Sequence, residues 1–161
     1  MTAPRQARAR LATEWVPQAP ARAPQPAGAR PPAQDQGRER EVEVERLCDL
    51  VRAQAQAQAM QNAVDQKANA ILKGITPTMT QYDIAKYLHD SIIKGCTYDL
   101  STKYCATMYG ALVEGRAHCQ GYSYAYLYLC KKAGIDCTNV VGYAGEEHMW
   151  NMNLIDGKWY F

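Results

Sequence analysis

The sequence has no run of about eighteen apolar residues, the length that a helix needs to cross a bilayer. Its N-terminus has no apolar segment of the kind that marks a secretory signal, so no signal peptide is recognised there. Six cysteines among 161 residues are too few for a disulfide-stabilised scaffold, and no two of them show C-x-x-C spacing. These absences argue against a membrane-spanning helix, a small disulfide-rich protein and the common zinc and redox motifs.

Positive charge is scarce outside the first forty residues. Residues 1–40 contain seven arginines and three acidic residues, a balance of +4, which leaves −2 of the total of +2 for the rest. The remainder therefore has no basic surplus with which to bind nucleic acid through counterion release. The arginines of residues 1–40 could touch nucleic acid or anionic lipid weakly, but a solvated disordered arm explains them more simply.

Lysine is absent before Lys67 and tyrosine before Tyr82, whereas seven of the eight prolines fall at or before Pro32. This change of composition divides the chain into three parts. Residues 1–40 are predicted to form a disordered Pro/Ala/Arg-rich arm. Residues 41–73 are predicted to form a lead-in helix, and residues 74–161 the folded domain.

Apolar residues at three- and four-residue steps predict the helices. Within 41–73 these residues are Leu47, Leu50, Val51, Ala57, Met60, Val64, Ala68 and Ile71, and Gly74 and Pro77 end the helix. A second helix is expected to follow Thr80 as its N-cap and to stop at Gly95. A short helical turn is expected over 107–112, and a third helix over 119–132 with its C-cap at Gly134.

After Gly134 the period of the apolar pattern changes from 3.6 to 2, which indicates strands. Two strands are predicted over 137–143 and 148–155. Asp156-Gly157 is a two-residue hairpin signal, and a third strand starts at Lys158. Helices first and antiparallel strands last is an α+β pattern.

Cys119 opens the third predicted helix, in the stretch GRAHCQGY. A thiol attacks as the thiolate, and the positive end of a helix or a nearby imidazole favours that form. Gly121 leaves the backbone accessible beside it and makes room for a substrate. Cys119 is therefore a candidate nucleophile, and its backbone N–H could face a developing oxyanion.

Three histidines are candidate partners for this thiol. His148 opens a predicted strand, from which an imidazole can be aimed at a helix N-terminus. His118 is adjacent in sequence, but neighbouring side chains point apart, so we expect it to be a poor base for Cys119. His89 lies in the middle of a helix and is interpreted as a structural hydrogen-bonding residue.

Simpler roles compete with catalysis for every cysteine. Packing is the expected role of four of them: Cys96, Cys105, Cys130 and Cys137. A zinc site made by Cys119, Cys130, Cys137 and His148 is conceivable, but its spacings match no standard zinc motif.

Two blocks, GRAHCQGYSYAYLYLCKKAGIDC and VVGYAGEEHMWNMNLIDGKWYF, resemble the transglutaminase-like domain of bacterial proteins. The shared pattern is Gly-x-x-x-Cys-x-Gly-Tyr, a helix ending in Gly-Ile, then His-x-Trp-Asn, and a Gly-x-Trp-Tyr strand. The segment ILKGITPTMTQYDIAKYLHDSIIKGCTYD is similar to the helical lead-in of the same family, so the resemblance covers residues 62–161.

The resemblance implies a papain-like α+β fold and a Cys-His-Asp triad. Cys119 matches the nucleophile and His148 the imidazole, whereas the aspartate is expected about two residues beyond Phe161. Asp156, in the predicted turn, is not a substitute for it. On this reading the domain is C-terminally incomplete.

The activity implied is that of a cysteine acyl-transferase or a hydrolase, such as a peptidase, acting on protein or peptide amides without a metal or organic cofactor. The alternative is a catalytically inactive interaction module of the same fold. Members of the family are often secreted or found at the cell surface.

Overall fold

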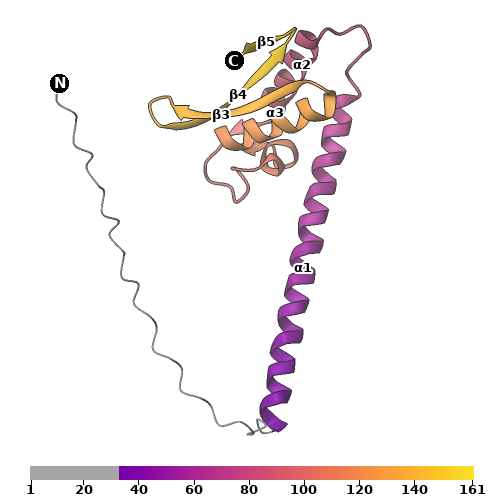
Figure 1. Ribbon diagram of the computed structural model, residues 1–161, viewed down its shortest axis with the longest axis vertical. Coiled ribbons are helices and arrows are strands. Elements are labelled where there is room, and N and C mark those ends of the chain that lie inside the picture. The colour runs from indigo at the N-terminus through magenta and orange to yellow at the C-terminus, as the bar shows by residue number, and fades with distance from the viewer. Residues whose placement is uncertain (1–32) are drawn as a thin grey trace, which may run out of the picture. The chain divides into compact units, whose positions relative to one another are not determined.

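The computed structural model describes residues 33–161, so residues 1–32 of the predicted arm lie outside the described part (Figure 1). The chain divides into a unit that ends at Val42 and a unit that runs from Glu43 to Phe161. All the packing described below belongs to the second unit. The predicted α+β class is confirmed, because helices come first and an antiparallel three-stranded sheet follows them.

The first helix, α1, spans Ala33–Leu72 and so begins eight residues before the predicted start at Glu41. Its last third packs against the domain. Val64 and Ala68 are buried in the core, whereas Leu47, Leu50 and Val51 are more than half exposed. The apolar pattern therefore predicted the helix correctly, but the apolar residues between Leu47 and Val51 do not belong to the buried core.

Asp65 joins α1 to the third helix. Its carboxylate accepts hydrogen bonds from the Tyr128 hydroxyl and from Gln61, and it forms an ion pair with Lys132 at 2.6 Å. Hydrogen bonds from Lys132, Tyr128 and Gln61 lower the pKa of Asp65 to about 2 from 3.8. A carboxylate whose pKa is depressed by folding stabilises the protein above the unfolded pKa and loses that effect as the pH falls through the folded pKa.

Replacing Asp65 with asparagine is therefore expected to lower the thermal midpoint at pH 7 by a few degrees, and the difference from wild type should shrink as the pH falls from 4 to 2. Asp49→Asn is the matched control on the same helix, because Asp49 pairs only with Arg52 and both side chains are exposed. A pH-independent loss in the Asp65 variant, or an equal loss in the Asp49 variant, would contradict this. Thermal unfolding followed by circular dichroism measures both.

The second helix, α2, spans Gln81–Gly95 and begins with the predicted N-cap. The Thr80 hydroxyl accepts the backbone N–H of Asp83, and the Asp83 carboxylate accepts the backbone N–H of Thr80. This reciprocal pair is a capping box, which fixes where the helix starts. Leu88 and Ile92 then place the apolar face of α2 in the core.

A short parallel pair of strands that the sequence did not indicate precedes the third helix. Strand β1 (Thr97–Tyr98) pairs with β2 (Arg116–Ala117), and the π-helical segment η1 (Gly110–Glu114) lies between them in sequence. Asp99, just after β1, forms an ion pair with Arg116. Hydrogen bonds from Ser101 and Arg116 lower the pKa of Asp99 to about 2, so this link persists in mild acid.

The third helix, α3, spans Cys119–Ala133 and ends at Gly134, as predicted. Its buried stripe consists of Ala125, Tyr126, Leu129 and Cys130. This stripe faces both α2 and the sheet. The Tyr126 hydroxyl donates to the backbone oxygen of Ala85 on α2 and accepts from Asn153 of the sheet. The helix is thus held at its middle from two sides.

The sheet has the order β3-β4-β5 and is antiparallel throughout. Strand β3 spans Asp136–Tyr143, β4 spans Glu147–Ile155 and β5 spans Lys158–Tyr160. The turn between β4 and β5 is the predicted two-residue hairpin: Asp156 and Gly157 both have positive φ, 49° and 78°. Such a turn favours a short polar residue followed by glycine.

Candidate active site

Cys119 is the first residue of α3, where the unpaired backbone N–H groups of a helix begin. A close approach of two backbone segments fixes this position. A Cβ at Gly121 would lie 2.4 Å from the Cys105 oxygen and 3.0 Å from the Thr107 oxygen. The His118 N–H also donates to the Cys105 oxygen at 3.0 Å. The loop before η1 therefore holds the start of α3 through backbone contacts.

His118 is the N-cap of α3, a role that the sequence analysis did not assign to it. Its Nδ1 accepts the backbone N–H of Gln120 at 3.3 Å and lies 3.8 Å from Cys119 Sγ. The expectation that the side chains of His118 and Cys119 point apart is thus corrected. The extended N-cap backbone (φ −101°, ψ −174°) turns the imidazole back over the first turn, as N-cap side chains do.

His148 is the second residue of β4, and the packing of β4 on α3 brings it towards Cys119. Asn153 contacts Tyr126 and Asn151 contacts Ser123, so residue numbers decrease together along the strand and the helix. One helical turn before Ser123, the same alignment brings the first residues of α3 beside the first residues of β4. His148 stacks on Trp150, with ring centroids 6.1 Å apart.

Polar contacts maintain this register. The hydroxyl of Ser123, a buried residue, donates to the Met149 oxygen at 3.0 Å. Asn151 Nδ2 donates to the Ser123 oxygen at 3.1 Å and to Asn139 Oδ1 at 2.7 Å. Ser123 lies four residues after Cys119, and Met149 follows His148, so this contact directly fixes the strand segment that contains His148.

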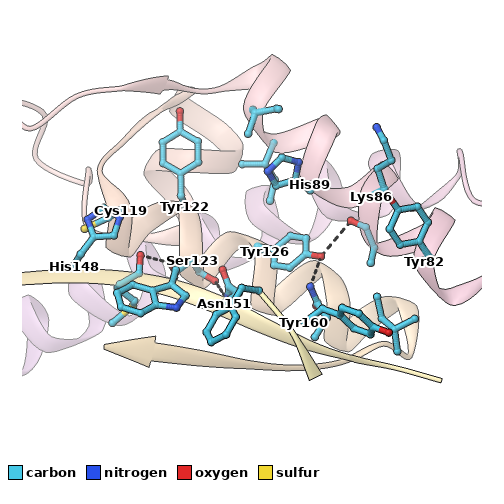
Figure 2. Close-up of a pocket in the computed structure, with 18 of the residues that line it drawn as sticks. Tyr82, Lys86, His89, Cys119, Tyr122, Ser123, Tyr126, His148, Asn151 and Tyr160 are labelled. Atoms are coloured by element: carbon cyan, nitrogen blue, oxygen red, sulfur yellow. Dashed lines mark hydrogen bonds between the residues drawn. The ribbon is translucent and has the colours of Figure 1, made fainter. Parts of the chain in front are cut away.

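Cys119 and His148 line the same cavity, which has a volume of about 820 Å³ (Figure 2). In the view of Figure 2 the two side chains lie at the same end of it, with Tyr122 and Ser123 beside them. The lining is mainly apolar and aromatic, from Ile92, Tyr126, Met149, Trp150 and Ile155, and comes from α2, α3 and the sheet. A mostly apolar cavity with a few converging polar groups is the usual form of a binding site.

In the view of Figure 2, Lys86 of α2 lies at the other end of the cavity, and His89 lies between Lys86 and Tyr122. His89 lies edge-on to Tyr126, at 6.4 Å between ring centroids, and its Nδ1 is 3.2 Å from the Asp90 carboxylate. These contacts agree with the structural role expected for it. Asp156 also lines the cavity, from the β4–β5 turn, where its backbone N–H donates to Gln81.

The remaining cysteines differ from Cys119 in their surroundings. Burial raises the pKa of the Cys96 thiol. A hydrogen bond with the Cys137 thiol, together with burial, raises the pKa of Cys130, whereas the same bond lowers that of Cys137. All six thiols are free. Within residues 33–161 no three Cys, His, Asp or Glu side chains are placed to share a metal ion, so the alternative zinc site has no support.

The sequence profile of the transglutaminase-like superfamily matches residues 65–161, which include both blocks that contain Cys119 and His148. The chain belongs to the transglutaminase-like superfamily. This confirms the family resemblance drawn from the motifs. None of the curated proteins matches this chain in sequence.

Two solved structures resemble this fold. One is a TGase, 17% identical, with a TM-score of 0.52; the match covers 63% of this chain and 30% of that one. The other, printed as a "Putative Cysteine Protease" from Cytophaga hutchinsonii, is 20% identical with a TM-score of 0.52; the match covers 60% of this chain and 35% of that one. This transglutaminase-like chain thus matches about a third of each of these proteins.

Proposed function

We propose that this transglutaminase-like domain is a cysteine acyl-transferase or hydrolase that acts on protein or peptide amides, with Cys119 as nucleophile and His148 as general base and acid. The observation that carries the proposal is the placement of both side chains in one cavity, the thiol at a helix N-terminus and the imidazole on the adjoining strand. A helix N-terminus favours the thiolate, which is the attacking form.

The reaction would begin with a proton moving from Cys119 Sγ to His148, followed by attack of the sulfur on the amide carbonyl. The new C–S bond gives a tetrahedral oxyanion, which the backbone N–H groups at the start of α3 can stabilise. When the C–N bond breaks, the imidazolium of His148 donates its proton to the leaving amine or ammonia. A thioester between the acyl group and Cys119 remains.

The second half of the reaction decides the product. A primary amine that attacks the thioester forms a new amide, which is a crosslink if the amine is a lysine side chain. Water that attacks it releases an acid, which is deamidation or peptide hydrolysis. Tyr122 and Tyr126 remain neutral hydrogen-bonding groups in the cavity, because burial raises the pKa of both phenols.

Alkylation by iodoacetamide, with each cysteine quantified by peptide mass spectrometry, tests the nucleophile. Cys119 is expected to react at least about tenfold faster at pH 7 than Cys48, because it begins a helix and shares a cavity with an imidazole that can accept its proton. Cys48 is the matched internal reference: it is a fully accessible thiol on α1. Cys119→Ala should abolish the fast phase and leave the rate at Cys48 unchanged.

Turnover is measured with casein as the amide donor and a dansylated primary amine as acceptor. Ammonia release reports transamidation and deamidation together, dansyl incorporation reports transamidation alone, and new N-termini report peptide hydrolysis. If Cys119 reacts no faster than Cys48, or if none of the three signals depends on Cys119, the enzymatic proposal is wrong. The inactive interaction module of the same fold would then be the better description.

A further inference from the structure

The imidazole of His118 contacts the sulfur of Cys119 from a direction that the proposed reaction does not use. Its Nδ1 is 3.8 Å from Cys119 Sγ and 3.3 Å from the backbone nitrogen of Gln120. The backbone of His118 is held by two hydrogen bonds, from its N–H to the Cys105 oxygen and from the Tyr122 N–H to its oxygen, and the Gln120 N–H orients the ring. A titratable nitrogen is thus fixed between the thiol and a helix-terminal N–H.

The two contacts of Nδ1 depend on its protonation. A neutral imidazole that accepts the Gln120 N–H at Nδ1 carries its hydrogen on Nε2. Nδ1 has a single lone pair, which the Gln120 N–H occupies, so it can take the proton of the neighbouring thiol only when that bond breaks. A protonated imidazole presents Nδ1–H instead, which pairs with a thiolate and no longer accepts from Gln120.

We infer that His118 is a second proton acceptor for Cys119: a positioning residue that stores the thiol proton and stabilises the thiolate before substrate binds. In this step the S–H bond breaks and an Nδ1–H bond forms, which leaves a thiolate beside an imidazolium. The Gln120 N–H loses Nδ1 as its acceptor and becomes free to bind the sulfur. One hydrogen-bond donor, the Gln120 N–H, therefore moves from the imidazole that caps the helix to the thiolate.

His118 and His148 are expected to have different tasks because of where they lie. His148 lines the cavity, so it can give a proton to the leaving group of a bound substrate. His118 contacts the Cys119 sulfur but is not among the residues that line the cavity, so we expect it to act on the thiol rather than on the substrate. His118 can therefore hold the thiol proton while the cavity is empty. When substrate binds, the proton returns to Sγ and passes to His148, which donates it to the leaving group.

The charged and titratable groups on the elements around this first turn do not replace His118. Arg116 on β2 is occupied by Asp99, and the Cys105 thiol is directed to the Leu100 oxygen. The phenol of Tyr122 donates to the Cys96 oxygen at 2.6 Å. The other such groups are Cys96, Glu114, Glu147 and His148.

The inference deepens the proposed function, and matched variants of the full chain test it. Asparagine and aspartate are both good N-caps, so His118→Asn and His118→Asp should retain the thermal midpoint, whereas His118→Ala should lower it. The alkylation rate of Cys119 by iodoacetamide is measured from pH 5 to 9, with Cys48 as reference. Each variant is made both in wild type and in His148→Ala.

In the His148→Ala background, His118→Asn is expected to slow alkylation of Cys119 at pH 6 by about tenfold, because the variant has no imidazole to accept the thiol proton and pair with the thiolate. His118→Asp should slow it further, since it places a negative charge beside the sulfur. If His118 acts only as a helix cap, Cys119 in His118→Asn should be alkylated with the same pH profile as in its parent, and that result would overturn the inference.

The outcomes separate this inference from the proposed function. Fast alkylation of Cys119 that is insensitive to His118 rejects the inference alone. Fast alkylation that depends on His118, without turnover of casein, supports the inference and rejects the enzymatic proposal. A Cys119 that reacts no faster than Cys48 in wild type rejects both.

Discussion

Replacement of His148 by alanine is expected to slow acyl transfer from casein by about 10²–10⁴-fold, the usual contribution of a general acid–base residue. The loss should appear in kcat rather than in KM, because His148 acts on the proton and not on the bulk of the substrate. His148 is half-buried and stacks on Trp150, so the change should have only a small effect on the thermal midpoint.

His89→Ala is the matched control, because His89 is a histidine that lines the same cavity from α2. Its loss should be at most severalfold and should appear in KM. Ammonia release and dansyl incorporation are measured for both variants at pH 7. Equal losses in the two variants would mean that the cavity merely requires an imidazole-sized lining, and the role proposed for His148 would be wrong.

Replacement of Gly121 by alanine is expected to destabilise the fold by about 2–3 kcal/mol, the cost of inserting a methyl group into a filled space. Alanine normally stabilises a helix relative to glycine. Here its Cβ would lie 2.4 Å from the Cys105 oxygen and 2.8 Å from the Ala117 Cβ. The backbone oxygen cannot move aside as a flexible side chain would, so either the loop or the start of α3 must shift.

Gly95→Ala is the control for this prediction, because nothing lies within 4 Å of a Cβ built on Gly95, near the end of α2. The two identical substitutions should have opposite signs, with Gly95→Ala neutral or stabilising by up to about 1 kcal/mol. Urea unfolding gives both free energies. Gly121→Ala should also slow alkylation of Cys119, since the same shift disturbs its helix turn; a fully stable variant would disprove the packing argument.

The helices and strands of the domain could be predicted because local signals mark their ends. Thr80 caps α2, Gly134 ends α3, and Asp156-Gly157 makes the hairpin, each through its own backbone preference. The pair β1–β2 gave no such signal. It is only two residues long and joins segments nineteen residues apart, so tertiary packing rather than periodicity forms it.

The site was predictable in part for the same reason. The motif indicated Cys119 and His148, and the structure places both in one cavity, although their roles remain proposals. The contact between His118 and Cys119 was not predictable, because histidine is not among the preferred N-caps and the sequence does not show the extended backbone that turns the ring. The role of Asn151 and Asn153 on β4 was equally hard to predict. The alternation of polar and apolar residues along a strand does not show that its polar face packs on α3.

The layer of Ser123, Tyr126, Asn151 and Asn153 between helix and sheet has a mechanical consequence. An interface of methyl groups tolerates small sliding, because van der Waals contact has little directionality. Hydrogen bonds of defined length and angle do not. α3 therefore cannot move by a fraction of a turn along β4 without breaking several of them at once. These hydrogen bonds thereby fix the spacing between the sulfur of Cys119 and the imidazole of His148.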